Sequence, residues 1–122
     1  MLKRIKAVVR TTGNETVSQT IQYVEAPIGE PVSLEVELRN DADVPVNLTG
    51  NLLRFRLYDH HGIKLYETTK TVTTGGSQGV TTIAVTVPTL RPKAYGWDLW
   101  YEAGGSKYQI VPVSVWKASS TY

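Results

Sequence analysis

The sequence has 122 residues, a net charge of +2 and no cysteine. This length fits one domain, which we expect to span residues 1–122. The missing cysteine excludes disulfides, thiolate catalysis and Cys-ligated metals, and the small net charge does not predict a nucleic-acid partner. No apolar run approaches the length of about 18 residues that a membrane-spanning helix needs, so we expect no membrane association.

Val, Ile, Thr and the aromatic residues together account for 47 of the 122 residues, a composition that favours strands. From the N-terminus, residues 5–9 and 17–24 are extended in pattern, with a turn-forming break at residues 12–14. Residues 1–12 are expected to form an N-terminal arm or an edge strand.

From residue 32 onward, apolar and polar residues alternate regularly along the chain. Between Val32 and Leu38 every second residue is apolar and the others are polar, which predicts a half-buried strand. Further strands are predicted at residues 53–58, 63–72, 81–87, 95–102 and 108–116. About seven to eight short strands separated by turns predict an all-β, immunoglobulin-like antiparallel β-sandwich.

The apolar faces of these strands define a predicted core. Trp100 and Trp116 lie on the alternate faces of their strands, so we expect them at an exposed or interface surface, because large aromatic residues are enriched there. A small cluster of their own is the alternative. The residues predicted to be buried together are Leu34, Val36, Phe55, Leu57, Val85, Trp97, Leu99 and Val113.

Residue types that carry chemistry form no recognisable site. Asp59-His60-His61 contains metal-ligand types, but adjacent strand residues point to opposite faces and no third ligand is suitably spaced. Asp98 and Glu102 are about 13 Å apart along one strand, too far for a glycosidase carboxylate pair. The glycine-rich segment 75–79 lacks the phosphate-loop pattern. We therefore expect no enzyme, no catalytic residues, no metal site and no cofactor.

Positive charge is concentrated near the N-terminus, in Lys3, Arg4, Lys6 and Arg10. A basic segment of this kind could be an arm that docks on a partner, or an edge strand that its lysines protect from aggregation. Nucleic acid is disfavoured because no aromatic residue accompanies these charges. We expect residues 1–10 to pair with a neighbouring subunit or a partner rather than to complete the core of their own domain.

Three motifs carry a resemblance to a known family. They are Val46-Asn-Leu-Thr-Gly50, the strand Arg54-Phe-Arg-Leu-Tyr-Asp59 followed by a Gly62 turn, and Tyr95-Gly-Trp-Asp98. Their order over residues 31–115 resembles the immunoglobulin-like N-terminal domain of phage baseplate upper proteins and related small β-sandwich modules of phage particles. Baseplate proteins continue beyond this domain, whereas this chain ends at Tyr122, which favours a free-standing component such as a capsid decoration protein.

The resemblance implies a non-enzymatic structural protein of a bacteriophage particle. It would dock on capsid or tail subunits, as a decoration protein or as a baseplate or tail accessory, and would stabilise the assembly. We expect self-association in the particle and a location in the virion after synthesis without a signal peptide, since no apolar stretch follows the charged N-terminus. The alternative is a carbohydrate-binding module that adheres to a host surface. The expected docking residues are Lys3, Arg4, Lys6, Arg10, Trp100 and Trp116.

Overall fold

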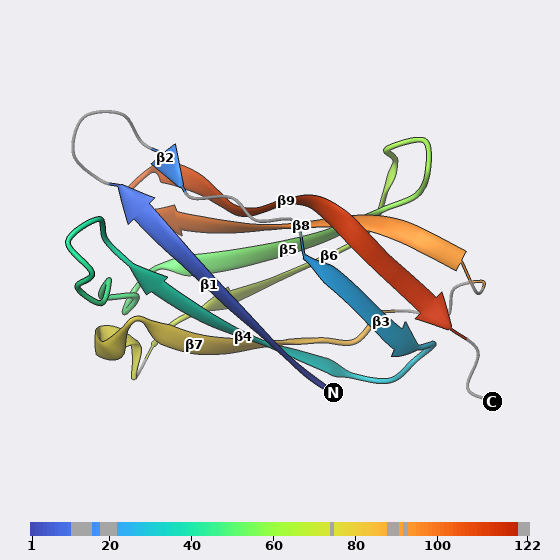
Figure 1. Cartoon of the computed structure of the whole chain (residues 1–122), viewed down its shortest axis with the longest axis horizontal. Helices are drawn as coiled ribbons and strands as arrows, with labels where there is room; N and C mark the ends of the chain where they lie inside the picture. Colours follow the sequence, from blue (N-terminus) through green and yellow to red (C-terminus); the bar gives the residue numbers. More distant parts are fainter. Residues whose placement is uncertain (11–15, 18–21, 74, 88–90, 92, 120–122) are drawn as a thin grey trace.

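A computed structural model describes residues 1–10, 16–17, 22–73, 75–87, 91 and 93–119. The described residues form nine strands and one short 3-10 helix. The strands make two sheets that pack face to face (Figure 1). The predicted all-β sandwich is confirmed, and the described residues contain no helix that could cross a membrane.

The smaller sheet has four strands. Its order is β2 (Thr16–Val17), β1 (Leu2–Arg10), β4 (Val32–Arg39) and β7 (Val80–Val85). Strand β4 pairs parallel with β1 and antiparallel with β7. The break predicted at residues 12–14, residues 18–21 of the segment predicted at 17–24, and residues 88–90 and 92 lie outside the described residues.

The larger sheet has five strands. Its order is β3 (Tyr23–Pro27), β9 (Ser106–Ser119), β8 (Lys93–Ala103), β5 (Leu52–Tyr58) and β6 (Lys64–Thr71). Tight hairpins make the β5–β6 and β8–β9 pairs antiparallel, and the first of them contains the predicted Gly62 turn. The β3–β9 and β1–β4 pairs are parallel, a direction that is possible because no tight hairpin turn joins the strands of either pair.

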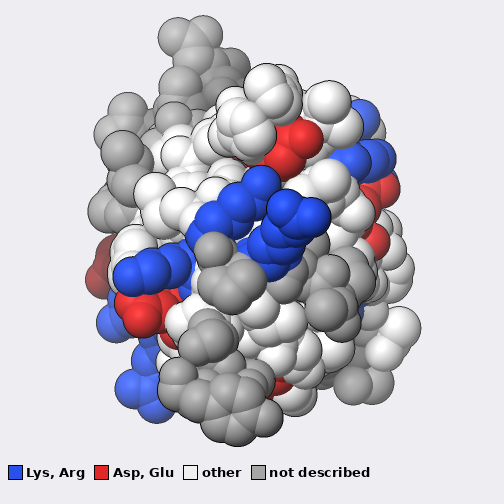
Figure 2. All heavy atoms as spheres, turned by 90° about the vertical axis from the view of Figure 1, so that its right-hand side faces the viewer, with Lys and Arg blue, Asp and Glu red and all other residues white. Residues whose placement is uncertain are grey.

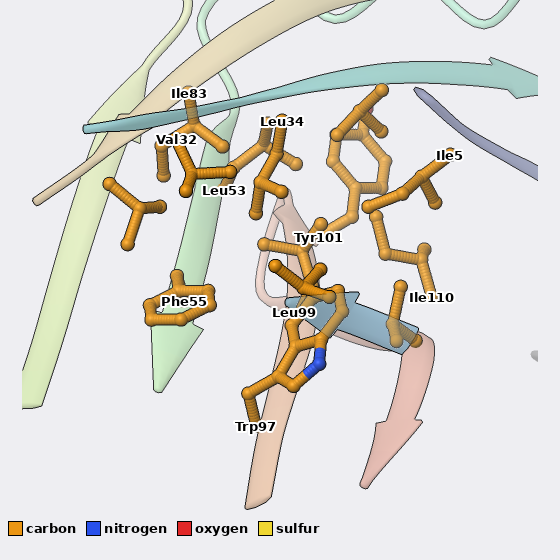
Figure 3. Packing of buried hydrophobic residues seen from close by; sticks show 14 of the residues in the cluster. Ile5, Val32, Leu34, Leu53, Phe55, Ile83, Trp97, Leu99, Tyr101 and Ile110 are labelled. Carbon is orange, nitrogen blue, oxygen red and sulfur yellow. The ribbon is translucent and has the colours of Figure 1, made fainter. Parts of the chain in front are cut away.

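The core fills the space between the two sheets. Figure 3 shows Ile5, Leu34 and Ile83 of the smaller sheet opposite Phe55 and Trp97 of the larger one. Phe55 and Trp97 are fully buried, with ring centroids 5.7 Å apart. The indole Nε1 of Trp97 donates a hydrogen bond to the carbonyl of Val115 at 3.1 Å. Of the predicted core residues, seven are buried: Leu34, Val36, Phe55, Leu57, Val85, Trp97 and Leu99.

Strand β9 departs from the simple alternation that the sequence suggested. Val113 is 61% exposed, whereas Trp116 is 2% exposed and its ring packs 5.4 Å from that of Phe55. The β8–β9 pairing shifts register between Trp97 and Leu99 and again between Leu99 and Trp100. Each shift places an extra residue on β9. The first lies between Val111 and Ser114, so Val113 does not share the inward face of Val111, and the second returns Ile110 and Tyr108 to the inward face. The predictions of a buried Val113 and an exposed Trp116 were therefore wrong.

The N-terminal residues belong to the fold of their own chain. Strand β1 pairs with β4 from Leu2 to Val8, and Ile5, Ala7 and Val9 are buried in the common core. The expectation that residues 1–10 leave the core to a neighbouring subunit does not fit this packing. Burial of three apolar side chains holds the segment in place.

The glycine-rich segment crosses between the sheets, from β6 to β7, through the 3-10 helix η1 (Gly76–Gln78). It is held against the preceding loop by hydrogen bonds from the Leu48 amide to the Gly76 carbonyl and from the Gly50 amide to the Val72 carbonyl. Gly79 has a φ of 73°, and a Cβ there would lie 2.5 Å from the carbonyl oxygen of Leu38. The segment therefore has a packing role.

Candidate docking surface

The outer face of the smaller sheet carries the N-terminal charges. The β1–β4 register places Arg4 beside Glu35 and Lys6 beside Glu37, and these pairs form ion pairs of 3.4 and 3.9 Å. The cations that the sequence suggested as a docking arm are thus balanced by glutamates of β4. Lys3 is partly exposed on the face of β1 that also carries Ile5, and the side chain of Arg10 lies outside what the structure describes.

The outer face of the larger sheet carries a network of charged side chains. Arg54 on β5 donates to Glu102 on β8 at 2.6 Å and to Glu67 on β6 at 3.1 Å. Arg56 contacts both carboxylate oxygens of Asp98 at 3.2 Å. The arginines were not singled out in the sequence. Alternation placed them on this face, but cross-strand register decides which carboxylate each one meets.

The contacts of the network shift the pKa values of Glu102 and Tyr58. The hydrogen bond from Arg54 holds the pKa of Glu102 below its usual value, with smaller contributions from the charges of Arg54 and Lys107. Burial raises the pKa of Tyr58, and the nearby Asp98 carboxylate adds to the effect. Asp98 itself is 3% exposed and also accepts a hydrogen bond from the Tyr58 hydroxyl. A buried carboxylate requires such partners, since an unpaired charge would be strongly destabilising.

Trp100 lies within this network on the outer face of β8. Its ring is partly exposed, and the guanidinium carbon of Arg56 lies 5.4 Å from its centroid. The indole Nε1 is buried and has no hydrogen-bond partner among the described residues. An unsatisfied buried donor costs about 1–3 kcal/mol.

Beside Trp100 the surface is hollowed into an open depression of about 430 Å³. Its lining residues come from β5, β6, β8 and β9, and most of them belong to the ion-pair network. They are Arg54, Arg56, Glu67, Trp100, Glu102 and Lys107.

A row of apolar side chains crosses the same face at the other end of β8. Tyr23 is the register partner of Val115, which in turn pairs with Gly96, and Gly96 pairs with Tyr58. Tyr23, Val113 and Val115 are 50%, 61% and 41% exposed. We call these three residues the apolar stripe. The sequence analysis missed the stripe because β9 was assigned the opposite face.

Basic side chains also gather at the end of the sandwich where β8 begins and β9 ends (Figure 2). Arg91, Lys93 and Lys117 belong to this end, and none forms an ion pair with a described acidic residue. Lys93 Nζ lies 5.1 Å from the centroid of the Tyr95 ring. These exposed cations border the apolar stripe through Lys117, two residues beyond Val115.

The histidine pair lies in an exposed turn. Asp59 Oδ1 accepts hydrogen bonds from the amides of His61 and Ile63, and these bonds lower the pKa of Asp59. The centroids of the two imidazole rings lie 3.9 Å apart, and the ring planes are tilted by 43°. Among the described residues, no cluster of three or more candidate ligands could hold a metal ion. The Asp59 carboxylate is used to form the turn.

The fold and surface define a small two-layer all-β domain whose larger sheet presents a chemically mixed face. No protein-family model matches the sequence, and no curated protein matches it. Among solved structures, it is similar to the N-terminal domain of phage TP901-1 ORF48, with 12% sequence identity and a TM-score of 0.49. The match covers 98% of this chain and 100% of that domain. A likeness of this size assigns neither a family nor a function.

Proposed function

We propose that this protein is a non-enzymatic structural component of a bacteriophage particle, which docks on capsid or tail subunits and stabilises the assembly. A capsid decoration protein and a baseplate or tail accessory both fit this role. The observation that carries the proposal is the apolar stripe on a rigid sheet face, because exposed apolar patches mark interaction sites. The three sequence motifs that resemble phage baseplate and decoration modules point to the same kind of particle.

The apolar stripe is the proposed contact with the virion subunit. Tyr23, Val113 and Val115 are 50%, 61% and 41% exposed among the described residues, and Tyr23 and Val115 are paired with each other in the sheet. Little side-chain ordering is needed before such a face can bind. The bordering Lys117 favours a partner whose apolar surface has an acidic edge.

The docking residues expected from the sequence take different places in this proposal. Trp100 lies on the same sheet face as the stripe and stays a candidate contact. Arg4 and Lys6 are already paired with glutamates, so we assign them a minor part. Trp116 lies under the face, in the core, and supports the stripe from beneath. Copies bound at repeated virion sites would also contact one another.

Co-sedimentation tests this proposal. The purified chain is mixed with capsid shells and, separately, with tails of the phage whose genome encodes it. Changing Val113 and Val115 together to Ser should weaken sedimentation with one of the two by about tenfold, which is about 1.4 kcal/mol of binding. Val44→Ser is the matched control, because Val44 is 52% exposed but follows β4 of the other sheet. Absence of binding to both particles, or equal binding by all variants, would contradict the proposal.

A further inference from the structure

We infer that the depression beside Trp100 is a binding site for a neutral saccharide. The site lies on the same sheet face as the proposed docking stripe but shares no residue with it. It is lined by an aromatic ring, guanidinium groups, carboxylates and an ammonium group. Its volume of about 430 Å³ lies within the range of small-ligand sites and is large enough for one or two sugar rings.

The charges of the site favour a neutral ligand. The cations of the depression are Arg54, Arg56 and Lys107, and the lining carboxylates are Glu67 and Glu102. The buried Asp98 balances Arg56, so that the lining residues together with Asp98 carry three positive and three negative charges. Lys64, which does not line the depression, adds a 3.4 Å ion pair to Glu67. An anionic ligand would compete with Glu67 and Glu102, and a cationic ligand would compete with the arginines. A polyhydroxylated ligand uses donors and acceptors of both kinds without disturbing this balance.

The polar groups are fixed in advance by the ion pairs. Arg54 uses Nε and Nη1 to bind Glu102 and Glu67, and its Nη2 has no hydrogen-bond partner among the described residues. Arg56 donates from Nε and Nη2 to Asp98, and its Nη1 also has no hydrogen-bond partner among the described residues. Planar guanidinium and carboxylate groups match neighbouring hydroxyls of a sugar ring. Preorganised groups lose little entropy when the ligand binds.

Trp100 supplies the apolar part of the site. Sugar rings present C–H faces that pack on aromatic rings, whose π-electron faces are negative. The indole Nε1, which has no acceptor among the described residues, gains one if a ligand hydroxyl reaches it after a side-chain adjustment at the rim. A buried donor without a partner and a partly exposed ring together distinguish this depression from an ordinary charged surface.

The test is a titration of the intact chain with methyl glucoside, methyl galactoside, N-acetylglucosamine, maltose and cellobiose, followed by tryptophan fluorescence and NMR shifts. At least one probe should bind with a Kd below about 10 mM. Trp100→Ala should weaken that binding by about tenfold or more. Lys107→Ala removes an exposed lining residue, should leave the fold intact and should weaken binding by about threefold. Val113→Ser, on the apolar stripe, is the control and should bind as the wild type does.

Failure of this inference is separable from failure of the docking proposal. The saccharide site is overturned if no neutral probe binds, or if Trp100→Ala and Lys107→Ala both bind as the wild type does. None of these results affects sedimentation of the stripe variants with phage particles. Conversely, saccharide binding by a chain that sediments with no particle would support the site and contradict the docking role.

Discussion

At the scale of single residues, stability is concentrated in the aromatic centre of the core. The ring of Phe55 lies 5.7 Å from that of Trp97, 5.4 Å from that of Trp116 and 6.2 Å from that of Tyr66. Each ring is therefore packed by others from neighbouring strands, and removing one leaves a cavity that its neighbours cannot fill. Interior packing at near-crystalline density makes such losses large.

Phe55→Ala should lower the free energy of unfolding by about 3–5 kcal/mol, the usual loss for a large buried aromatic residue. Urea denaturation followed by circular dichroism measures the loss. Val113→Ala is the control, because Val113 is 61% exposed and its truncation should change stability by about 0.5 kcal/mol or less. A loss below about 1 kcal/mol for Phe55→Ala would contradict the packing described for the core.

The carboxylate of Glu102 makes stability depend on pH. Its pKa is lower in the folded chain than in the unfolded chain because Arg54 donates to it. The unfolded chain therefore binds the proton more readily. The stabilisation from Glu102 is fully present above its unfolded pKa, and it is lost as pH falls through its folded pKa.

Glu102→Gln should accordingly lose less stability than the wild type between about pH 7 and about pH 3. Urea denaturation at both values gives the difference. Glu30→Gln, which alters an exposed carboxylate outside the network, should retain the wild-type dependence. The same pH dependence for Glu102→Gln and the wild type would show that the Arg54–Glu102 bond is not formed in solution.

At the scale of elements, strand β1 joins the N-terminus to the core through its pairing with β4. Ile5 is 1% exposed, whereas Lys6 beside it has a side chain that is 77% exposed. Ile5 therefore contributes to the packing of the core, and Lys6 contributes to the surface charge. Substituting each of them tests one of the two roles considered for the segment.

Ile5→Ala should cost about 2–5 kcal/mol, whereas Lys6→Ala should cost less than about 1 kcal/mol because an exposed ion pair contributes little. Deletion of Met1 to Lys6 should lower the melting temperature markedly. Thermal denaturation of the three variants decides between an integral strand and a docking arm. An unchanged melting temperature after the deletion would show that the segment is a docking arm rather than an integral strand.

At the scale of the whole molecule, the charges are mostly balanced within the chain. The net charge is +2, and the ion pairs of both outer faces are internal. Long-range attraction to a partner is therefore weak, and contact between apolar surfaces should dominate association. Exposed charges are also screened beyond about 8 Å at physiological salt.

Sedimentation with phage particles should weaken only about tenfold, roughly 1.4 kcal/mol, between low and moderate salt. A nucleic-acid binder that neutralises several phosphates would lose about a thousandfold or more over a fourfold salt increase. The measurement is sedimentation at stepped salt concentrations with the wild type and with the variant in which Val113 and Val115 are both Ser. Loss of binding at higher salt, together with normal binding by that variant, would show that basic side chains rather than the apolar stripe make the contact.

The sequence by itself determined the all-β class, most strand positions and most of the core. Alternation over residues 32–38 and 53–57 reports burial directly, because successive strand side chains point to opposite faces. It also placed Arg54, Arg56, Asp98 and Trp100 on outer faces. The turn at Gly62 was also predictable from the local sequence, because glycine favours the positive φ that this turn adopts.

Only the tertiary structure decided the features that depend on pairing between distant strands. The register shift between Val111 and Ser114 put Val113 on the outer face and left Trp116 in the core, and the parallel pairing of β1 with β4 made the predicted arm a core strand. The same kind of pairing brought Arg54 to Glu102 and Arg56 to Asp98. Register is a property of two strands together, and a one-residue slip reverses every side chain, so neither strand alone encodes the outcome.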